Sequence, residues 1–179
     1  MIRRRHIRSL ADRLLQKHAI SQPPVDVRAL AQALGAEVRM HRADAELSGF
    51  LLRDSAKRRT IIGVNTEQHP NRQRFTIAHE IGHLLLHEGR PMYIDSTQQV
   101  FRLSLRSKDS STGEIVAERE ANLFAAEVLM PEALIERELA TTPEFDVHDE
   151  KQVQRLADRF QVSAQALSIQ LGHLGYTNA

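Results

Sequence analysis

The pentapeptide His79-Glu80-Ile81-Gly82-His83 constrains this chain more than any other feature. On an α-helix of about 3.6 residues per turn, positions 79 and 83 lie one above the other, so both imidazoles can bind one metal ion. Glu80 projects beside that face, where a carboxylate can take a proton from an activated water. The flanking segments are apolar, which indicates a largely buried helix. Because unpartnered polar groups are costly there, the pattern favours a metal site over isolated structural histidines.

His87 continues the same helical face by one more turn and resembles a third ligand. In an unbroken helix, however, residues eight apart are about 12 Å apart along the axis, too far to converge on one ion. The spacing also differs from the longer metzincin pattern, in which a glycine turns the chain before a third histidine. We therefore expect His87 to end the helix, where the dipole favours a cation. The third ligand should come from elsewhere.

A second helix is predicted shortly before Pro131. Ser111 and Glu114 have the spacing of a capping box, which opens a helix, and Pro131 closes it. Ala121 and Ala125 lie on one face of this helix. Small residues at those positions would let it approach the His79 helix closely.

Glu118 and Asn122 share the face that carries these small residues. This arrangement favours Glu118 as the third ligand and Asn122 as an outer partner that holds a ligating group in position. Glu120 points about 200 degrees away on the same helix and is the alternative ligand. The competing interpretation of Glu120 is a solvated charge beside Arg119.

Together, the two segments resemble the ImmA/IrrE metallopeptidases, a gluzincin-like family with an HExxH helix and a later helix of the form E-x-x-A-N-x-F-A-A-x-x-L-M-P. The corresponding runs are residues 74–87 and 118–131. The resemblance implies a zinc ion bound by His79, His83 and Glu118, with Glu80 as the catalytic acid and base. Other divalent metals stay open, because nitrogen and oxygen ligands do not select zinc by themselves.

The resemblance also implies a reaction and a partner. Families like this one tend to cleave a transcriptional repressor, often a helix-turn-helix protein encoded nearby, and so relieve repression in response to stress or mobile-element signals. We therefore expect a zinc-dependent endopeptidase with a protein substrate. The enlarged polar segment 106–113 departs from the family pattern and predicts different substrate access. The group that steadies the oxyanion lies outside both motifs, with Tyr93, His173 and Tyr176 as candidates.

The composition is that of a soluble globular protein, with 41% hydrophobic and 26% charged residues. No stretch reaches the roughly 20 apolar residues that cross a bilayer, and the N-terminus lacks the apolar core of a signal peptide. We therefore expect a cytoplasmic protein without a membrane partner. The absence of cysteine leaves only nitrogen and oxygen donors for a metal.

The remaining patterns predict an α+β fold of the zincin-like type. Helical spacing marks residues 7–14 and 27–34, and strands are expected at 37–40, 49–52 and 59–65. In such an architecture a small antiparallel or mixed sheet packs against the His79 helix. We interpret Ile61 to Asn65 as an edge strand that pairs with an extended substrate, with an ordinary core strand as the alternative.

We assign residues 1–140 to a metallopeptidase domain and residues 141–179 to a C-terminal helical appendage. Two helices in the appendage, 153–160 and 164–171, have a helix-turn-helix outline with Ser163 as N-cap. This outline supports a competing function, a DNA-binding or antirepressor protein that acts by binding rather than by proteolysis. Against direct nucleic-acid binding, the net charge is only +1 and the second helix has no Arg or Lys. The basic run from Arg3 to Arg8 is interpreted as solvated.

Overall fold

The computed structural model describes residues 2–87, 92–96, 112–142 and 144–176. The chain forms two compact units, the first containing Met1–Ile7 and Asp26–Ala125 and the second containing Arg8–Val25 and Ala126–Ala179. Each unit is a set of segments that contact one another more than they contact the rest of the protein. The division into a domain of residues 1–140 and an appendage of residues 141–179 stays a prediction.

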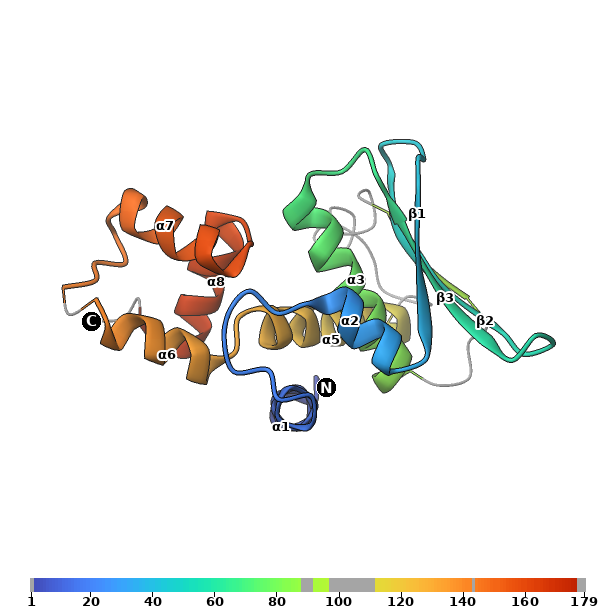
Figure 1. Ribbon diagram of the computed structural model, residues 1–179, viewed down its shortest axis with the longest axis horizontal. Helices are drawn as coiled ribbons and strands as arrows, with labels where there is room; N and C mark the ends of the chain where they lie inside the picture. The colour runs from blue at the N-terminus through green and yellow to red at the C-terminus, as the bar shows by residue number, and fades with distance from the viewer. Residues whose placement is uncertain (1, 88–91, 97–111, 143, 177–179) are drawn as a thin grey trace. The chain divides into compact units, whose positions relative to one another are not determined.

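The first unit is built on a mixed four-stranded sheet with the strand order β1-β3-β2-β4 (Figure 1). β3 pairs in parallel with β1 and antiparallel with β2, and β4 pairs antiparallel with β2. The predicted α+β fold with a mixed sheet is confirmed, whereas the sequence analysis missed β4. The strands are β1 (Ala36–His41), β2 (Leu47–Asp54), β3 (Arg59–Asn65) and β4 (Met92–Ser96).

The prediction that Ile61 to Asn65 forms an edge of the sheet is wrong. These residues belong to β3, which has a hydrogen-bonded neighbour on each side. All five residues are buried, and a continuous buried run is the pattern of an interior strand covered on both faces. In the part of the sheet that the structure describes, the edges are β1 and β4.

Helix α3 (Pro70–Leu86) carries the histidine motif and lies along one face of the sheet (Figure 1). Pro70 stands in its first turn, where the missing N–H costs nothing, and the His69 ring accepts a hydrogen bond from the Asn71 backbone N–H at 3.2 Å. Gly49 on β2 permits close packing, since a Cβ there would collide with the Thr76 side chain of α3. The Thr76 side chain of the motif helix therefore packs directly against β2 at Gly49.

Local sequence signals explain the next elements of the first unit. Asp26 caps α2 (Val27–Ala33), because its carboxylate accepts hydrogen bonds from the backbone N–H groups of Arg28 and Ala29. Gly35 follows this helix with a φ of +80°, a conformation that glycine adopts without strain. Helix α5 (Thr112–Leu129) carries the second motif. Ser111, the first residue of the predicted capping box, lies outside the described residues.

Helix α1 (Arg4–Lys17) begins in the first unit and continues in the second, with its predicted apolar face buried. The other helices of the second unit are α6 (Glu132–Ala140), α7 (Glu150–Phe160) and α8 (Ala164–Leu174). Ser163 caps α8 as predicted, since its hydroxyl accepts a hydrogen bond from the Ala166 N–H at 3.1 Å. Phe160 and Leu167 are fully buried, so α7 and α8 both contribute to the core of this unit.

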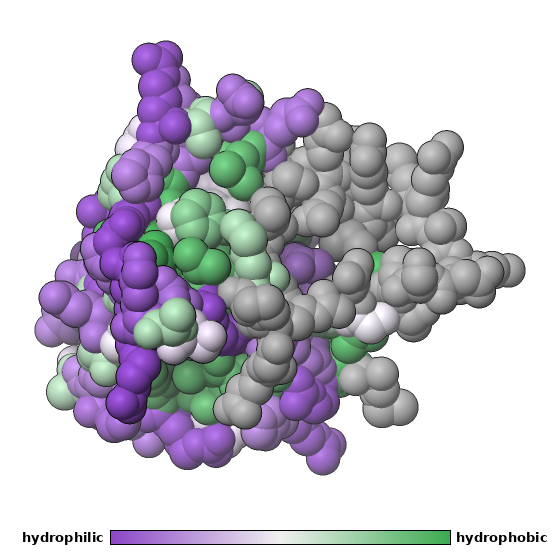
Figure 2. All heavy atoms as spheres, turned by 90° about the vertical axis from the view of Figure 1, so that its right-hand side faces the viewer, coloured by the Kyte–Doolittle hydropathy of each residue, from purple (hydrophilic) through white to green (hydrophobic). Residues whose placement is uncertain are grey.

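No helix in the described part of the chain is long and apolar enough to cross a bilayer. The face shown in Figure 2 carries mainly hydrophilic residues, with some hydrophobic ones near its middle. Large apolar side chains of the first unit lie in the interior instead. Those that are at most 1% exposed include Leu51, Ile62, Ile77 and Ile81.

Candidate metal centre

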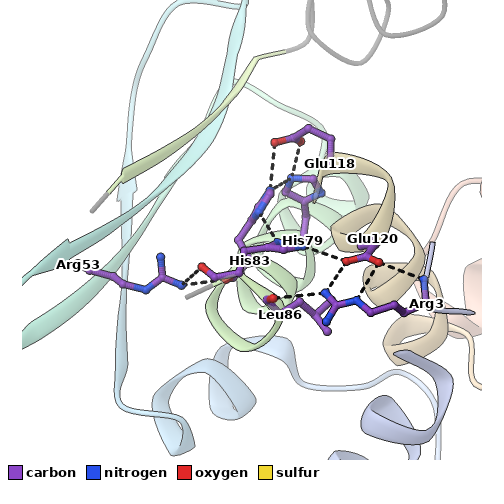
Figure 3. Close-up of polar contacts among 8 residues, drawn as sticks. Arg3, Arg53, His79, His83, Leu86, Glu118 and Glu120 are labelled. Atoms are coloured by element: carbon purple, nitrogen blue, oxygen red, sulfur yellow. Dashed lines mark hydrogen bonds and ion pairs between the residues drawn. The ribbon is translucent and has the colours of Figure 1, made fainter. Parts of the chain in front are cut away.

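Two histidines of α3 and one glutamate of α5 point toward one another (Figure 3). The Nε2 atoms of His79 and His83 are 3.0 Å apart. The Glu118 carboxylate oxygens lie 3.2 Å from His79 Nε2 and 3.3 Å from His83 Nε2. One atom from each residue therefore lies within 4.8 Å of the others. Two nitrogens and one carboxylate oxygen are a donor set of catalytic zinc sites, which keep a further position for water or substrate.

The packing of the two helices brings these ligands together. His79 and His83 lie one turn apart on α3 and are each 1% exposed, whereas the Glu118 side chain is 16% exposed. The small residues Gly82 and Ala121 stand where α3 meets α5, as the sequence pattern predicted for Ala121. The cluster can therefore form without a long side chain separating the helices.

The protonation states of the cluster suit a cation. Burial lowers the pKa of His83 to about 4, although the hydrogen bond with Glu118 opposes this shift. Burial raises the pKa of Glu118, but its contacts with the His79 and His83 rings outweigh this and bring it to about 2. At neutral pH the His83 ring is therefore neutral and the carboxylate is ionised, which are the forms that coordinate a metal.

Asn122 on α5 contacts one ring of the cluster, and its role as an outer partner of a metal ligand stays a prediction. Its side-chain Oδ1 is 2.9 Å from His79 Nδ1. An amide oxygen accepts only, so in the neutral ring the proton is assigned to Nδ1 and the lone pair to Nε2. That lone pair faces the cluster, as metal coordination requires.

Glu80 is fully buried on α3 between the two histidines in sequence. Its carboxylate is therefore held in the interior of the first unit rather than in bulk solvent. A carboxylate in such a position can act as a general acid or base once a substrate brings the reacting atoms within hydrogen-bonding distance.

His87 ends α3 as predicted. Its side chain is only 11% exposed, and burial lowers its pKa, which disfavours the cation expected at this helix end, although the contact with Glu120 opposes the shift. Its Nδ1 lies 3.1 Å from His83 Nδ1, and its Nε2 lies 3.2 Å from Glu120 Oε2. His87 therefore contacts a member of the cluster without belonging to it.

Glu120 is not the solvated charge that the sequence suggested, since its side chain is 3% exposed. Arg3 donates to it from the backbone N–H and from Nε, both at 3.0 Å to Oε1, and from Nη2 at 2.6 Å to Oε2 (Figure 3). The Arg3 guanidinium lowers the pKa of Glu120 to about 2. The interpretation of the N-terminal basic run as merely solvated is accordingly wrong at Arg3.

A comparison with protein families agrees with this site. A family model described as the IrrE N-terminal-like domain, a peptidase family, matches residues 31–171. This chain belongs to the ImmA/IrrE metallopeptidase family. The resemblance inferred from the two motifs is thus confirmed. Family membership agrees with the His79, His83 and Glu118 cluster, whose donor atoms fit a divalent metal ion.

Among solved structures, a Mycobacterium tuberculosis transcriptional regulator is similar to this ImmA/IrrE family member, with a TM-score of 0.61 and 14% sequence identity. The match covers 91% of this chain and 45% of that protein, so the chain spans less than half the length of the regulator. At this identity the similarity shows a common fold only. No curated protein matches the chain in sequence.

Sequence analysis missed Arg53, which supports the end of the motif helix in this family member. Arg53 extends from β2 toward His83 (Figure 3). Its Nη2 donates to the backbone carbonyls of His83 at 2.8 Å, Leu84 at 3.3 Å and His87 at 3.2 Å. A cation at the C-terminal carbonyls stabilises a helix. No local sequence signal links Arg53 to α3, because the two lie about 30 residues apart in the chain.

Other residues were predicted to affect substrate access and to stabilise the oxyanion. Most of the polar segment 106–113 and the side chain of Tyr93 lie outside the described residues. His173 and Tyr176 belong to the second unit. The oxyanion role of each candidate therefore stays a prediction.

Proposed function

We propose that this protein is a zinc-dependent endopeptidase that cleaves a specific transcriptional repressor, a helix-turn-helix protein, and thereby relieves repression in a stress response or in mobile-element regulation. The observation that carries the proposal is that His79 and His83 of α3 lie close to Glu118 of α5. The buried Glu80 lies on the same helix as the two histidines. Membership of a metallopeptidase family supports the chemistry. The similar fold of a transcriptional regulator is in keeping with a regulatory role. We place the protein in the cytoplasm, where such a repressor acts.

His79, His83 and Glu118 would hold the metal ion, with Asn122 orienting the His79 ring. Zinc suits this donor set, although another divalent ion can occupy it according to availability. A bound zinc ion supplies Lewis acidity, which makes a water more acidic and polarises the scissile carbonyl.

Glu80 is the catalytic acid and base in this proposal. Its carboxylate accepts a proton from the attacking water and delivers that proton to the amine nitrogen as the peptide C–N bond breaks. Burial of Glu80 supports this role because it limits proton exchange with bulk solvent before the leaving amine is protonated.

The alternative is a DNA-binding or antirepressor protein that acts by binding. The helix-turn-helix outline of α7 and α8 favours this alternative. Against a DNA target, α8 has no Lys or Arg and the net charge is +1, so few phosphate contacts are available from that helix. Binding to a repressor without cleaving it is therefore the alternative that the experiment must separate.

The test incubates the purified protein with the repressor encoded beside its gene, with zinc and after zinc removal, and follows the fragments by mass spectrometry. We compare the wild type with Glu80→Gln, and use Glu127→Gln as the control because Glu127 is another buried glutamate, 4% exposed, in the second unit. Wild type and control should cleave only with zinc, and Glu80→Gln should be slower by about 10²–10⁴-fold.

Two results would count against this proposal. Cleavage at the wild-type rate by Glu80→Gln would exclude Glu80 as the general base. A stable complex with the repressor, without cleavage by the zinc-loaded wild type, would instead support the antirepressor function.

A further inference from the structure

We propose that Arg3, Glu120 and His87 are positioning residues that orient His83 and strengthen its binding of the metal ion. Together with His83 they form a hydrogen-bonded series, Arg3–Glu120–His87–His83, which we call the His83 support chain. Figure 3 labels its members Arg3, Glu120 and His83. The inference rests on the proposed metal site. It goes further by assigning a function to three residues that lie outside the metal-ligating cluster.

The direction of the hydrogen bonds in the support chain follows from His83, the proposed metal ligand. Coordination by His83 requires a lone pair on Nε2, so the proton of the neutral ring is on Nδ1. That N–H donates to His87 Nδ1 at 3.1 Å, which must then be the acceptor. The remaining proton of the His87 ring is therefore on Nε2, where it donates to Glu120 Oε2 at 3.2 Å. Every N–H in the series has an acceptor.

The opposite direction is incompatible with a metal ligand. If His87 Nδ1 were the donor, His83 would carry its proton on Nε2, the atom that faces His79 Nε2 at 3.0 Å. A protonated Nε2 has no lone pair for a cation. The geometry thus connects metal binding at His83 with one tautomer of His87.

Arg3 fixes the far end of the chain by holding the Glu120 carboxylate through both oxygens. It also donates to the Leu86 carbonyl at the end of α3, at 3.4 Å. The Glu120 side chain is 3% exposed, so water screens its negative charge poorly. A carboxylate behind a ligating imidazole orients the ring and makes it a stronger donor to the metal.

The two ligating histidines therefore have different outer partners. His79 is hydrogen bonded to the neutral amide of Asn122, whereas His83 is connected through His87 to an anion. This difference provides an internal comparison, because changes behind one ligand should not alter the hydrogen bond behind the other.

The experiment measures zinc affinity of the full-length protein by competition with a chromophoric chelator. We compare the wild type with Glu120→Gln and His87→Phe, which break the support chain at successive positions. Glu127→Gln is the matched control, since Glu127 is also buried on α5 and also forms an ion pair with an arginine, Arg8. Each chain variant should bind zinc about 10- to 100-fold more weakly, and the control should keep the wild-type affinity.

Two further measurements separate positioning from general loss of stability. The double variant Glu120→Gln/His87→Phe should bind zinc no more weakly than His87→Phe alone, because both changes break one chain. The fold losses of zinc affinity caused by Glu120→Gln and Asn122→Ala should multiply in the double variant, because the two changes lie behind different histidines. Nitrogen-15 NMR of the zinc-loaded wild type should find the ring proton of His83 on Nδ1 and that of His87 on Nε2.

The outcomes distinguish this inference from the proposed metal site. If His79→Ala loses zinc while Glu120→Gln and His87→Phe keep the wild-type affinity, the support chain has no positioning role. Should His79→Ala bind zinc like the wild type, the metal site itself is wrong. If either chain variant fails to fold, His87→Asn decides the question. Its amide can still accept from His83 but no longer reaches Glu120, so wild-type affinity would overturn the inference.

Discussion

Gly82 on α3 and Ala121 on α5 meet with almost no room for another carbon atom between them. A Cβ at Gly82 would lie 3.0 Å from the Ala121 Cα and 3.2 Å from its carbonyl oxygen. His83 directly follows Gly82, and Glu118 lies one helical turn before Ala121. We therefore expect this contact to set the separation between the proposed metal ligands of the two helices.

Gly82→Ala should push the helices apart by a few tenths of an ångström. We expect zinc to bind more weakly and the protein to lose about 1–3 kcal/mol of stability, the usual cost of overpacking. Chelator competition and denaturant unfolding measure the two effects. Gly113→Ala is the control, because a Cβ there meets nothing within 4 Å and alanine is the better helix former. Wild-type zinc affinity in Gly82→Ala would show that the contact does not control the ligand geometry.

Single alanine substitutions should identify the third ligand. After dialysis against a weak chelator, metal analysis should find no stoichiometric zinc in His79→Ala, His83→Ala or Glu118→Ala, because each loses a donor atom. Glu120→Ala should retain zinc, with a lower affinity. If metal is kept in Glu118→Ala but lost in Glu120→Ala, our assignment of the carboxylate ligand is wrong.

Asn122 should affect zinc affinity through the His79 ring. Asn122→Ala removes the acceptor of the His79 Nδ1 proton, and we expect zinc to bind about 10-fold more weakly. Asn122→Asp keeps an oxygen acceptor in a side chain of similar shape and should recover most of that affinity. Equal losses in the two variants, measured by chelator competition, would show that Asn122 acts by packing rather than by hydrogen bonding.

Glu127 should make the stability of the protein depend on pH. Burial raises its pKa, while its ion pair with Arg8 opposes the shift. A carboxyl with a raised pKa in the folded state contributes stability that is fully present below its unfolded pKa of about 4.3. That contribution is lost as the pH rises through the higher pKa of the folded state, because ionisation is then less favourable than in the unfolded chain.

Glu127→Gln removes this ionisation and leaves a neutral side chain of similar shape. The stability of Glu127→Gln relative to the wild type should therefore increase as the pH rises from about 4 to 7. Urea unfolding at a series of pH values, with the same metal content for both proteins, measures the difference. A difference that is constant or decreases with pH would contradict a raised pKa at Glu127.

Local signals predicted the elements that carry the candidate site. The spacing of His79 and His83 depends only on helix geometry, and Asp26 and Ser163 cap their helices through bonds to nearby N–H groups. Pro131 ends α5 and precedes α6 as expected. Each of these signals acts over a few residues, so it can be recognised without knowledge of the fold.

The sequence left an edge strand and a core strand as alternatives for Ile61 to Asn65, because the second neighbour of β3, β1, pairs with it in parallel and comes from an earlier part of the chain. Hydrogen bonding between distant strands has no short-range sequence signature. The run of residues without charge from Ile61 to Val64 was the available sequence signal for an interior strand.

By itself, the sequence determined the motif helix, its two histidines, the glutamate between them and a second helix offering Glu118 and Asn122. Tertiary structure alone decided which distant groups surround that motif. Arg3 and Glu120 are 117 residues apart in the chain, yet half-exposed Arg3 forms an ion pair with the buried Glu120 carboxylate, and this pair leads through His87 to His83. Local spacing cannot predict this pair, because Arg3 precedes α1 and Glu120 lies on α5. The two residues meet only when the N-terminal segment, α3 and α5 pack together.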